Sequence, residues 1–125
     1  MRILAKVASC LLLTVGCRGA GSLVQQAPAK AAAMDNPQAG NHRAWWAGAK
    51  LYARECAACH GPHREGRGKA PCLNQSEVHQ AAPGTLFWVL RNGSLHRGMP
   101  SFAHLPEPQR WQIITFLQDA GARPR

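Results

Sequence analysis

The stretch Cys56–Gly61 reads CAACHG, a Cys-x-x-Cys-His motif. On a helical turn, Cys59 and His60 stand three and four positions after Cys56, so the three side chains project from one face. Two thiols so placed can form thioethers with the edge of a porphyrin, while the imidazole reaches the iron from one side. The motif therefore predicts one haem c, bound covalently through Cys56 and Cys59, with His60 as the proximal iron ligand.

Two other readings of the motif use the same cysteines differently. Cys56 and Cys59 could form a disulfide, or they could bind zinc together with His63 and Cys72. A disulfide leaves the adjacent histidine without a role. Zinc ribbons usually carry two Cys-x-x-Cys pairs, and this chain has one. The haem interpretation is favoured on these grounds.

The start of the chain has the pattern of an export signal. Residues 1–16 combine two early basic residues with an apolar run too short to span a membrane, and small residues follow. The stretch from Thr14 to Cys17 resembles the lipobox of bacterial lipoproteins, although Thr14 departs from the usual leucine. We therefore expect export to the periplasm, with a possible membrane anchor through a lipidated Cys17.

The 125 residues allow one small domain, and the charge is strongly basic at +9. Residues 17–43 are rich in Ala, Gln, Gly and Pro and predict a flexible tether, followed by a domain at 44–121 and a tail at 122–125. A basic domain is steered towards acidic protein faces. Nucleic acid is not expected as a partner, because no recognised nucleic-acid motif is present.

Four helices are expected in the domain. Asn41 should cap a helix that runs to the haem motif, and residues 76–82 form a short helix capped by Ser76. Thr85 should cap a helix that stops at Asn92-Gly93, and the last helix should run from Pro106 to Ala120. Between these helices, the segments 63–73 and 94–105 contain Gly and Pro and should be loops.

Met99 lies in the second of these loops and is the candidate sixth ligand of the iron. It is the methionine that the folded domain can offer, since Met1 leaves with the signal and Met34 lies in the expected tether. A thioether suits haem iron, and His/Met ligation raises its potential. The alternatives are an open sixth site or one of three histidines as the ligand: His79, His96 or His104.

These residues resemble the class I c-type cytochromes of the short bacterial kind, over about residues 44–121. The resemblance covers the segment before the haem motif, the motif itself, the loop Gly68–Leu73, the Met99-Pro100 pair and the last helix. It implies His60 and Met99 as axial ligands, and the carbonyl of Pro71 as acceptor for the outer N–H of His60. Cys72 departs from the family pattern, and so does Leu105-Pro106-Glu107 ahead of the last helix.

The resemblance implies an all-α cytochrome c fold, with about three to five helices wrapped around the haem. An iron held on both sides favours one-electron transfer between redox proteins, by a monomer or a subunit of a redox complex, over enzyme catalysis. The alternative is a ligand sensor or haem enzyme with a displaceable sixth ligand. We expect five side chains around or beside the porphyrin, Leu73, Trp88, Leu90, Phe102 and Trp111. We also expect a basic docking rim for an acidic partner, drawn from Arg64, Arg67, Lys69, Arg91 and Arg97.

Overall fold

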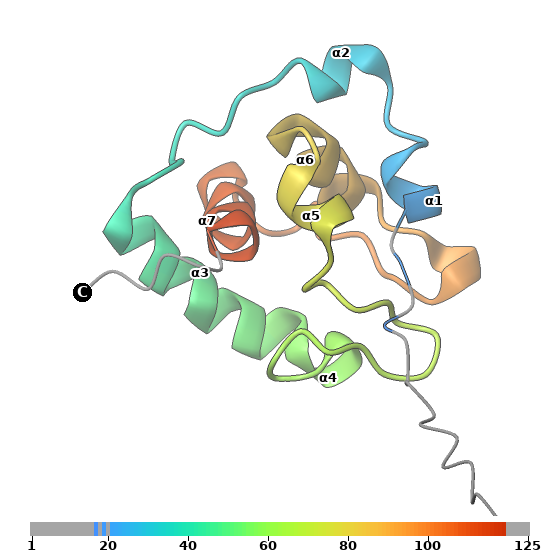
Figure 1. Ribbon diagram of the computed structural model, residues 1–125. Coiled ribbons are helices and arrows are strands. Elements are labelled where there is room, and N and C mark those ends of the chain that lie inside the picture. The colour runs from blue at the N-terminus through green and yellow to red at the C-terminus, as the bar shows by residue number, and fades with distance from the viewer. Residues whose placement is uncertain (1–16, 18, 20, 120–125) are drawn as a thin grey trace, which may run out of the picture.

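The computed structural model describes residues 17, 19 and 21–119, and its regular elements are helices (Figure 1). No strand occurs in this part of the chain, so the expected all-α class is confirmed. The expected signal peptide and the tail at 122–125 lie outside the described residues. None of the described helices is both long and apolar enough to cross a bilayer. In chain order the helices are α1 (Gly21–Val24), α2 (Ala29–Ala32), α3 (His42–Glu55), α4 (Ala57–His60), α5 (Ser76–Gln80), α6 (Pro83–Asn92), the 3-10 turn η1 (Leu95–Arg97) and α7 (Glu107–Gln118).

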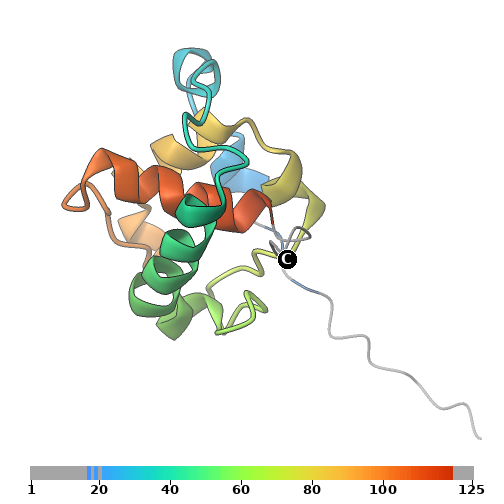
Figure 2. The same cartoon turned by 90° about the vertical axis from the view of Figure 1, so that its left-hand side faces the viewer.

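The two longest helices, α3 and α7, cross in close contact (Figure 2). The Asn41 side chain accepts hydrogen bonds from the backbone N–H groups of Arg43 and Ala44, which confirms the expected cap of α3. At the crossing, a Cβ on Gly48 would collide with the Gln112 carbonyl oxygen. The glycine is therefore required by the approach of the two backbones.

Helix α6 packs on α7 through an aromatic stack that lies in the core. The rings of Phe87 and Trp111 are stacked with their centroids 4.2 Å apart. The guanidinium carbon of Arg110 lies over the ring of Phe87, 4.6 Å from the ring centroid. Ile113 and Ile114 on α7 are completely buried. These contacts fix α7 as the central helix, with α3 on one side and α6 on the other.

Two of the expected helix caps are wrong. Ser76 lies inside α5, whose cap position is Gln75. Helix α6 begins at Pro83, so Thr85 lies buried in its first turns instead of capping it. A proline in the first turn removes an N–H that would otherwise lack a partner, so the helix can start there without a side-chain cap. The helix stops where expected, at Gly93 with a φ of 63°.

The N-terminal segment also differs from expectation, because part of the predicted tether at 17–43 is packed on the domain (Figure 1). The N–H of Gly84 donates to the Met34 carbonyl at 3.0 Å, and a Cβ at Gly84 would collide with the backbone of α2. Asn36 is buried, and its amide donates to the Thr115 hydroxyl at 2.9 Å. This segment is held by hydrogen bonds and a close backbone contact. Its packing therefore does not depend on large apolar residues, which is why the composition predicted a tether.

Candidate haem-binding site

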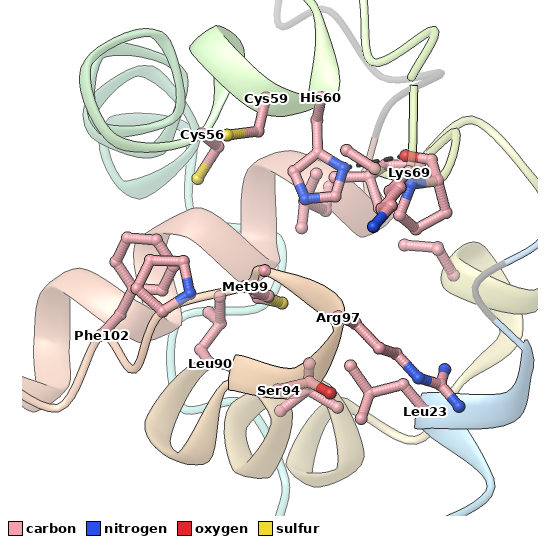
Figure 3. A pocket seen from close by; sticks show the side chains of 18 of the residues that line it. Leu23, Cys56, Cys59, His60, Lys69, Leu90, Ser94, Arg97, Met99 and Phe102 are labelled. Atoms are coloured by element: carbon pink, nitrogen blue, oxygen red, sulfur yellow. Dashed lines mark hydrogen bonds between the residues drawn. The ribbon is translucent and has the colours of Figure 1, made fainter. Parts of the chain in front are cut away.

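A cavity of about 650 Å³ lies between α4, α6 and the loops that flank them (Figure 3). Its size is typical of cofactor pockets, and most of its lining is apolar. It brings together the cysteines and histidine of the motif with Pro71 and Met99, residues far apart in the sequence. The site residues expected from the sequence thus surround a single cavity.

The Cys-x-x-Cys-His motif forms one wall of this cavity. Cys56 joins the end of α3 to the start of α4, and its carbonyl accepts from the N–H groups of Cys59 at 3.1 Å and His60 at 2.9 Å. This turn places the two sulfurs side by side at one end of the cavity, while the His60 ring projects into it (Figure 3). Both cysteines are free thiols, so they are not joined in the alternative disulfide.

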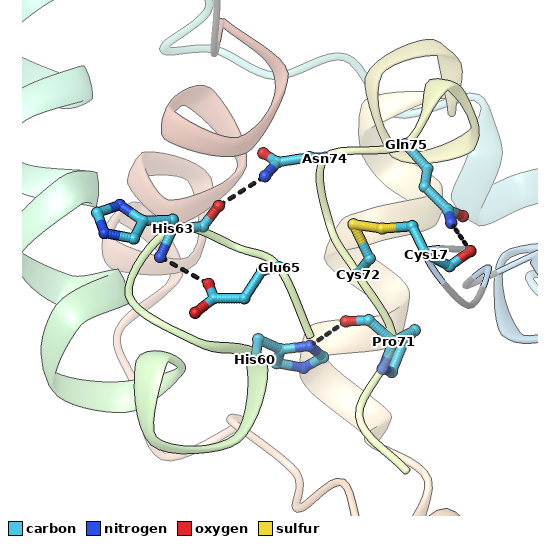
Figure 4. The surroundings of a disulfide bond; sticks show 8 residues. All are labelled: Cys17, His60, His63, Glu65, Pro71, Cys72, Asn74 and Gln75. Atoms are coloured by element: carbon cyan, nitrogen blue, oxygen red, sulfur yellow. Dashed lines mark hydrogen bonds between the residues drawn. A yellow bond between two sulfur atoms is a disulfide. The ribbon is translucent and has the colours of Figure 1, made fainter. Parts of the chain in front are cut away.

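The orientation of His60 is set by the loop that follows the motif. Its Nδ1 lies 2.8 Å from the Pro71 carbonyl oxygen (Figure 4). A carbonyl can only accept, so we assign the proton to Nδ1, which leaves the lone pair of Nε2 free. A histidine in this tautomer, held by a second hydrogen bond, has the form that a metal ligand needs.

Tyr52 on α3 fixes the end of the motif. Its hydroxyl donates to the Gly61 carbonyl at 2.7 Å, and burial raises its pKa above the ordinary value, so the donor stays protonated.

Burial, followed by the charges of Glu55 and Cys59, raises the pKa of the Cys56 thiol to about 12. Cys56 is therefore a protonated thiol at neutral pH in this fold.

Met99 faces His60 from the opposite wall (Figure 3). It follows η1, and a pair of backbone hydrogen bonds with Ser94, of 2.8 and 3.1 Å, holds its position in the loop. Gly98, just before it, has a φ of 84°, a conformation that glycine adopts without strain. The side chain of Met99 is partly buried against the apolar core.

The rest of the lining agrees only in part with the side chains expected near a porphyrin. Leu73, Leu90 and Phe102 line the cavity, whereas Trp88 and Trp111 do not. Trp111 is instead buried in the stack with α6. The lining residues that the sequence did not indicate include Leu23 and Val24 of α1, Val78, Leu86, Val89, Ile113 and Leu117. No local pattern distinguishes these from ordinary core positions.

Positive charge gathers at the end of the cavity away from the cysteines, where Lys69 and Arg97 lie (Figure 3). Arg67 also lines the cavity. Two other arginines expected in the basic rim do not line it. Arg64 lies over the Phe116 ring, 4.8 Å from its centroid, and Arg91 is exposed on α6.

Cys72, which departs from the family pattern, forms a disulfide with Cys17, with their Cα atoms 5.5 Å apart (Figure 4). A sulfur in a disulfide cannot carry a lipid thioether, so the expectation of a lipidated Cys17 is corrected. The same bond removes Cys72 from the alternative zinc site. Among the described residues, no group of three or more His, Cys, Asp or Glu side chains is placed to hold a metal ion.

The sequence of this chain is similar to that of known proteins over part of its length. Over 66 residues, or 51% of this chain, the sequence is 42% identical to the quinohemoprotein alcohol dehydrogenase ADH-IIG of Pseudomonas putida, and the match spans 9% of that protein. No solved structure matches the chain. Residues 43–117, more than half of the chain, match the family described as cytochrome c oxidase, cbb3-type, subunit III. The chain therefore belongs to this family and carries a c-type cytochrome domain, a haem-binding domain of electron transfer.

Proposed function

We propose that this protein is a one-electron carrier whose haem c is attached through Cys56 and Cys59 and whose iron lies between His60 and Met99. The observation that carries the proposal is the placement of these two side chains on opposite walls of one cavity (Figure 3). The bound haem supplies an iron that alternates between ferric and ferrous states. If His60 and Met99 both bound the iron, no position on it would remain open for a substrate, which favours a carrier over an enzyme.

The residues around the cavity have distinct roles in this proposal. The Pro71 carbonyl accepts from Nδ1 and so holds the His60 ring with Nε2 free to bind the iron. Lys69 and Arg97 lie at the end of the cavity away from the thiols and would offer positive charge to the two carboxylates of a bound haem. The apolar side chains exclude water, which limits the change in solvation when an electron arrives.

The disulfide and the expected signal at 1–16 support an exported protein, because disulfides persist in oxidising compartments such as the periplasm. The partners would be redox proteins that exchange electrons at the cavity edge, with this chain acting as a monomer or as a subunit of a redox complex. The alternative, a haem enzyme or ligand sensor, requires Met99 to leave the iron easily.

The haem-loaded protein should therefore titrate as a one-electron couple and should not bind carbon monoxide in the ferrous state. Potentiometric titration with visible spectra tests the first part, and addition of carbon monoxide to the reduced protein tests the second. Rapid binding of carbon monoxide by the wild-type protein would favour the sensor or enzyme instead.

Arg67 provides a test of docking to an acidic partner, because it is exposed and lines the cavity. The Arg67→Glu variant should react about three- to tenfold more slowly with an acidic redox protein at low salt, because steering by charge is weakened. Raising the ionic strength should lower the reaction rate of the wild type and reduce the difference in rate between the wild type and Arg67→Glu. Lys50→Glu makes the same charge change on α3, away from the cavity lining, and serves as the control. If the stopped-flow rates are the same for the wild type and Arg67→Glu and do not change with ionic strength, this docking surface is refuted.

A further inference from the structure

The N-terminal segment contributes to the wall of the cavity, although it lies before the part of the chain that matches the family. Gly19, Leu23 and Val24 line the cavity, whereas the family match begins at residue 43. We propose that Gly19 and helix α1 (Gly21–Val24) form an additional haem-binding element, a strap that the Cys17–Cys72 disulfide holds over the pocket. The inference rests on the proposed function, because it concerns the environment of the bound haem.

The strap lies at the end of the cavity opposite the thiols. Figure 3 shows Leu23 next to Arg97 and on the far side of the cavity from Cys56 and Cys59. Helix α1 packs on α5 and α6, and its Leu23 and Val24 side chains are partly buried. The strap thus places apolar side chains where a haem attached to the motif would otherwise meet solvent.

The disulfide is the covalent link between the start of the described chain and the loop that follows the motif. Cys17 lies two positions before the strap, and its carbonyl also accepts from the side-chain amide of Gln75 (Figure 4). Its partner Cys72 is only 3% exposed and belongs to the loop that follows the motif. Because α1 is only four residues long, the helix itself contributes little stability, so we expect the disulfide to add to the packing contacts that hold it in place.

The loop on the other side of the disulfide has anchors of its own. The N–H of Gly66 donates to the His60 carbonyl at 2.7 Å, and the N–H of Leu73 donates to the Arg64 carbonyl at 2.8 Å. These bonds hold the loop around Pro71 whether or not the disulfide is present. Breaking the disulfide should therefore release the strap and leave the hydrogen bond from His60 to Pro71 in place.

Release of the strap has a definite effect on the haem potential. Ferric haem carries one more positive charge than ferrous haem, and water stabilises the extra charge. A pocket that admits water therefore favours the ferric state and has a lower midpoint potential. Cys17 and Cys72 act in this way as positioning residues, through the strap that they hold.

The test measures the midpoint potential of the haem-loaded, full-length protein with Cys17→Ser, Cys72→Ser and the double substitution. Each variant should show the same fall, about three- to tenfold in the ratio of ferrous to ferric haem at a fixed potential, where tenfold is about 59 mV. The effects should not add, because all three variants break one bond. A fall in Cys72→Ser alone would assign the effect to packing of Cys72 and would overturn the clasp.

A second pair of variants keeps the disulfide intact, so the test does not depend on the folding of the cysteine variants. Leu23→Ala should lower the potential in the same direction, whereas Met34→Ala should leave it unchanged, because Met34 is 41% exposed and does not line the cavity. An unchanged potential in Leu23→Ala would overturn the strap. So would a mass spectrum of the exported protein with lipid on Cys17 and a free Cys72 thiol. A wild-type protein without covalent haem would instead refute the proposed function.

Discussion

Replacement of Cys56 and Cys59 by alanine is expected to remove covalently bound haem and to leave the domain largely unfolded. Both sulfurs lie at one end of the cavity, and they are the free thiols of the described chain. Without them the haem would be held only by axial contacts that can dissociate. A haem stain of the denatured polypeptide measures the covalent attachment, and far-ultraviolet circular dichroism measures the remaining helix.

Loss of the helical fold follows from the size of the cavity. If the space of about 650 Å³ stayed empty, the cost at about 24 cal/mol per Å³ would be on the order of 16 kcal/mol. Water entering from the open side reduces this figure, yet it compares with the whole stability of a small domain, about 5–15 kcal/mol. The core residues that line the cavity, such as Leu90 and Ile113, would then contact water.

The control for this experiment removes the two other cysteines that the structure describes. The double variant Cys17→Ser/Cys72→Ser lacks the disulfide but retains the motif, so it should keep covalent haem and most of its helix. A Cys56→Ala/Cys59→Ala protein that still stains for haem after denaturation would contradict the attachment site. A variant that loses haem but keeps full helix content would contradict the role of haem in the core.

The sequence predicted the helix that leads to the Cys-x-x-Cys-His motif and the Asn41 cap of that helix, because both depend on local patterns. Met99 was expected as the sixth ligand because it is the methionine that the folded domain can offer, and the structure places it in the lining of the cavity. The Asn41 cap is a short-range hydrogen bond, and the motif is defined by spacing within one turn. The caps of α5 and α6 were predicted wrongly. Ser76 and Thr85 are residue types that often cap helices, but the cap position of α5 is Gln75 and α6 begins at Pro83.

The N-terminal segment could not be predicted for a different reason. Its contacts are long-range: Asn36 reaches Thr115, and Cys17 reaches Cys72, across 79 and 55 positions of sequence. Composition measures only how much apolar area a segment can bury, and it suggested a tether. The apolar composition of a segment does not reveal a buried amide, a glycine that permits close packing or a disulfide.

The second large effect is expected from Met99→Ala, which should open the sixth position of the iron while leaving the haem attached. The loop should keep its shape, because the two hydrogen bonds between residues 94 and 99 involve backbone groups. The ferric protein should lose the weak far-red absorption that reports thioether sulfur on haem iron, and the ferrous protein should gain carbon monoxide binding. The midpoint potential should fall by on the order of 0.1 V, because His/Met ligation raises it, within a range of about 0.8 V set by axial ligands.

The absorption spectra of Met99→Ala also test whether a histidine is the sixth ligand in place of Met99. His79, His96 and His104 do not line the cavity, so none of them stands ready to occupy the position that Met99→Ala vacates. Met34→Ala removes a methionine outside the cavity and should leave every spectrum unchanged. If Met99→Ala keeps the wild-type spectrum and still excludes carbon monoxide, another residue holds the iron. The proposed ligand pair would then be wrong while haem attachment stands, because attachment depends on the two thiols and not on the sixth position.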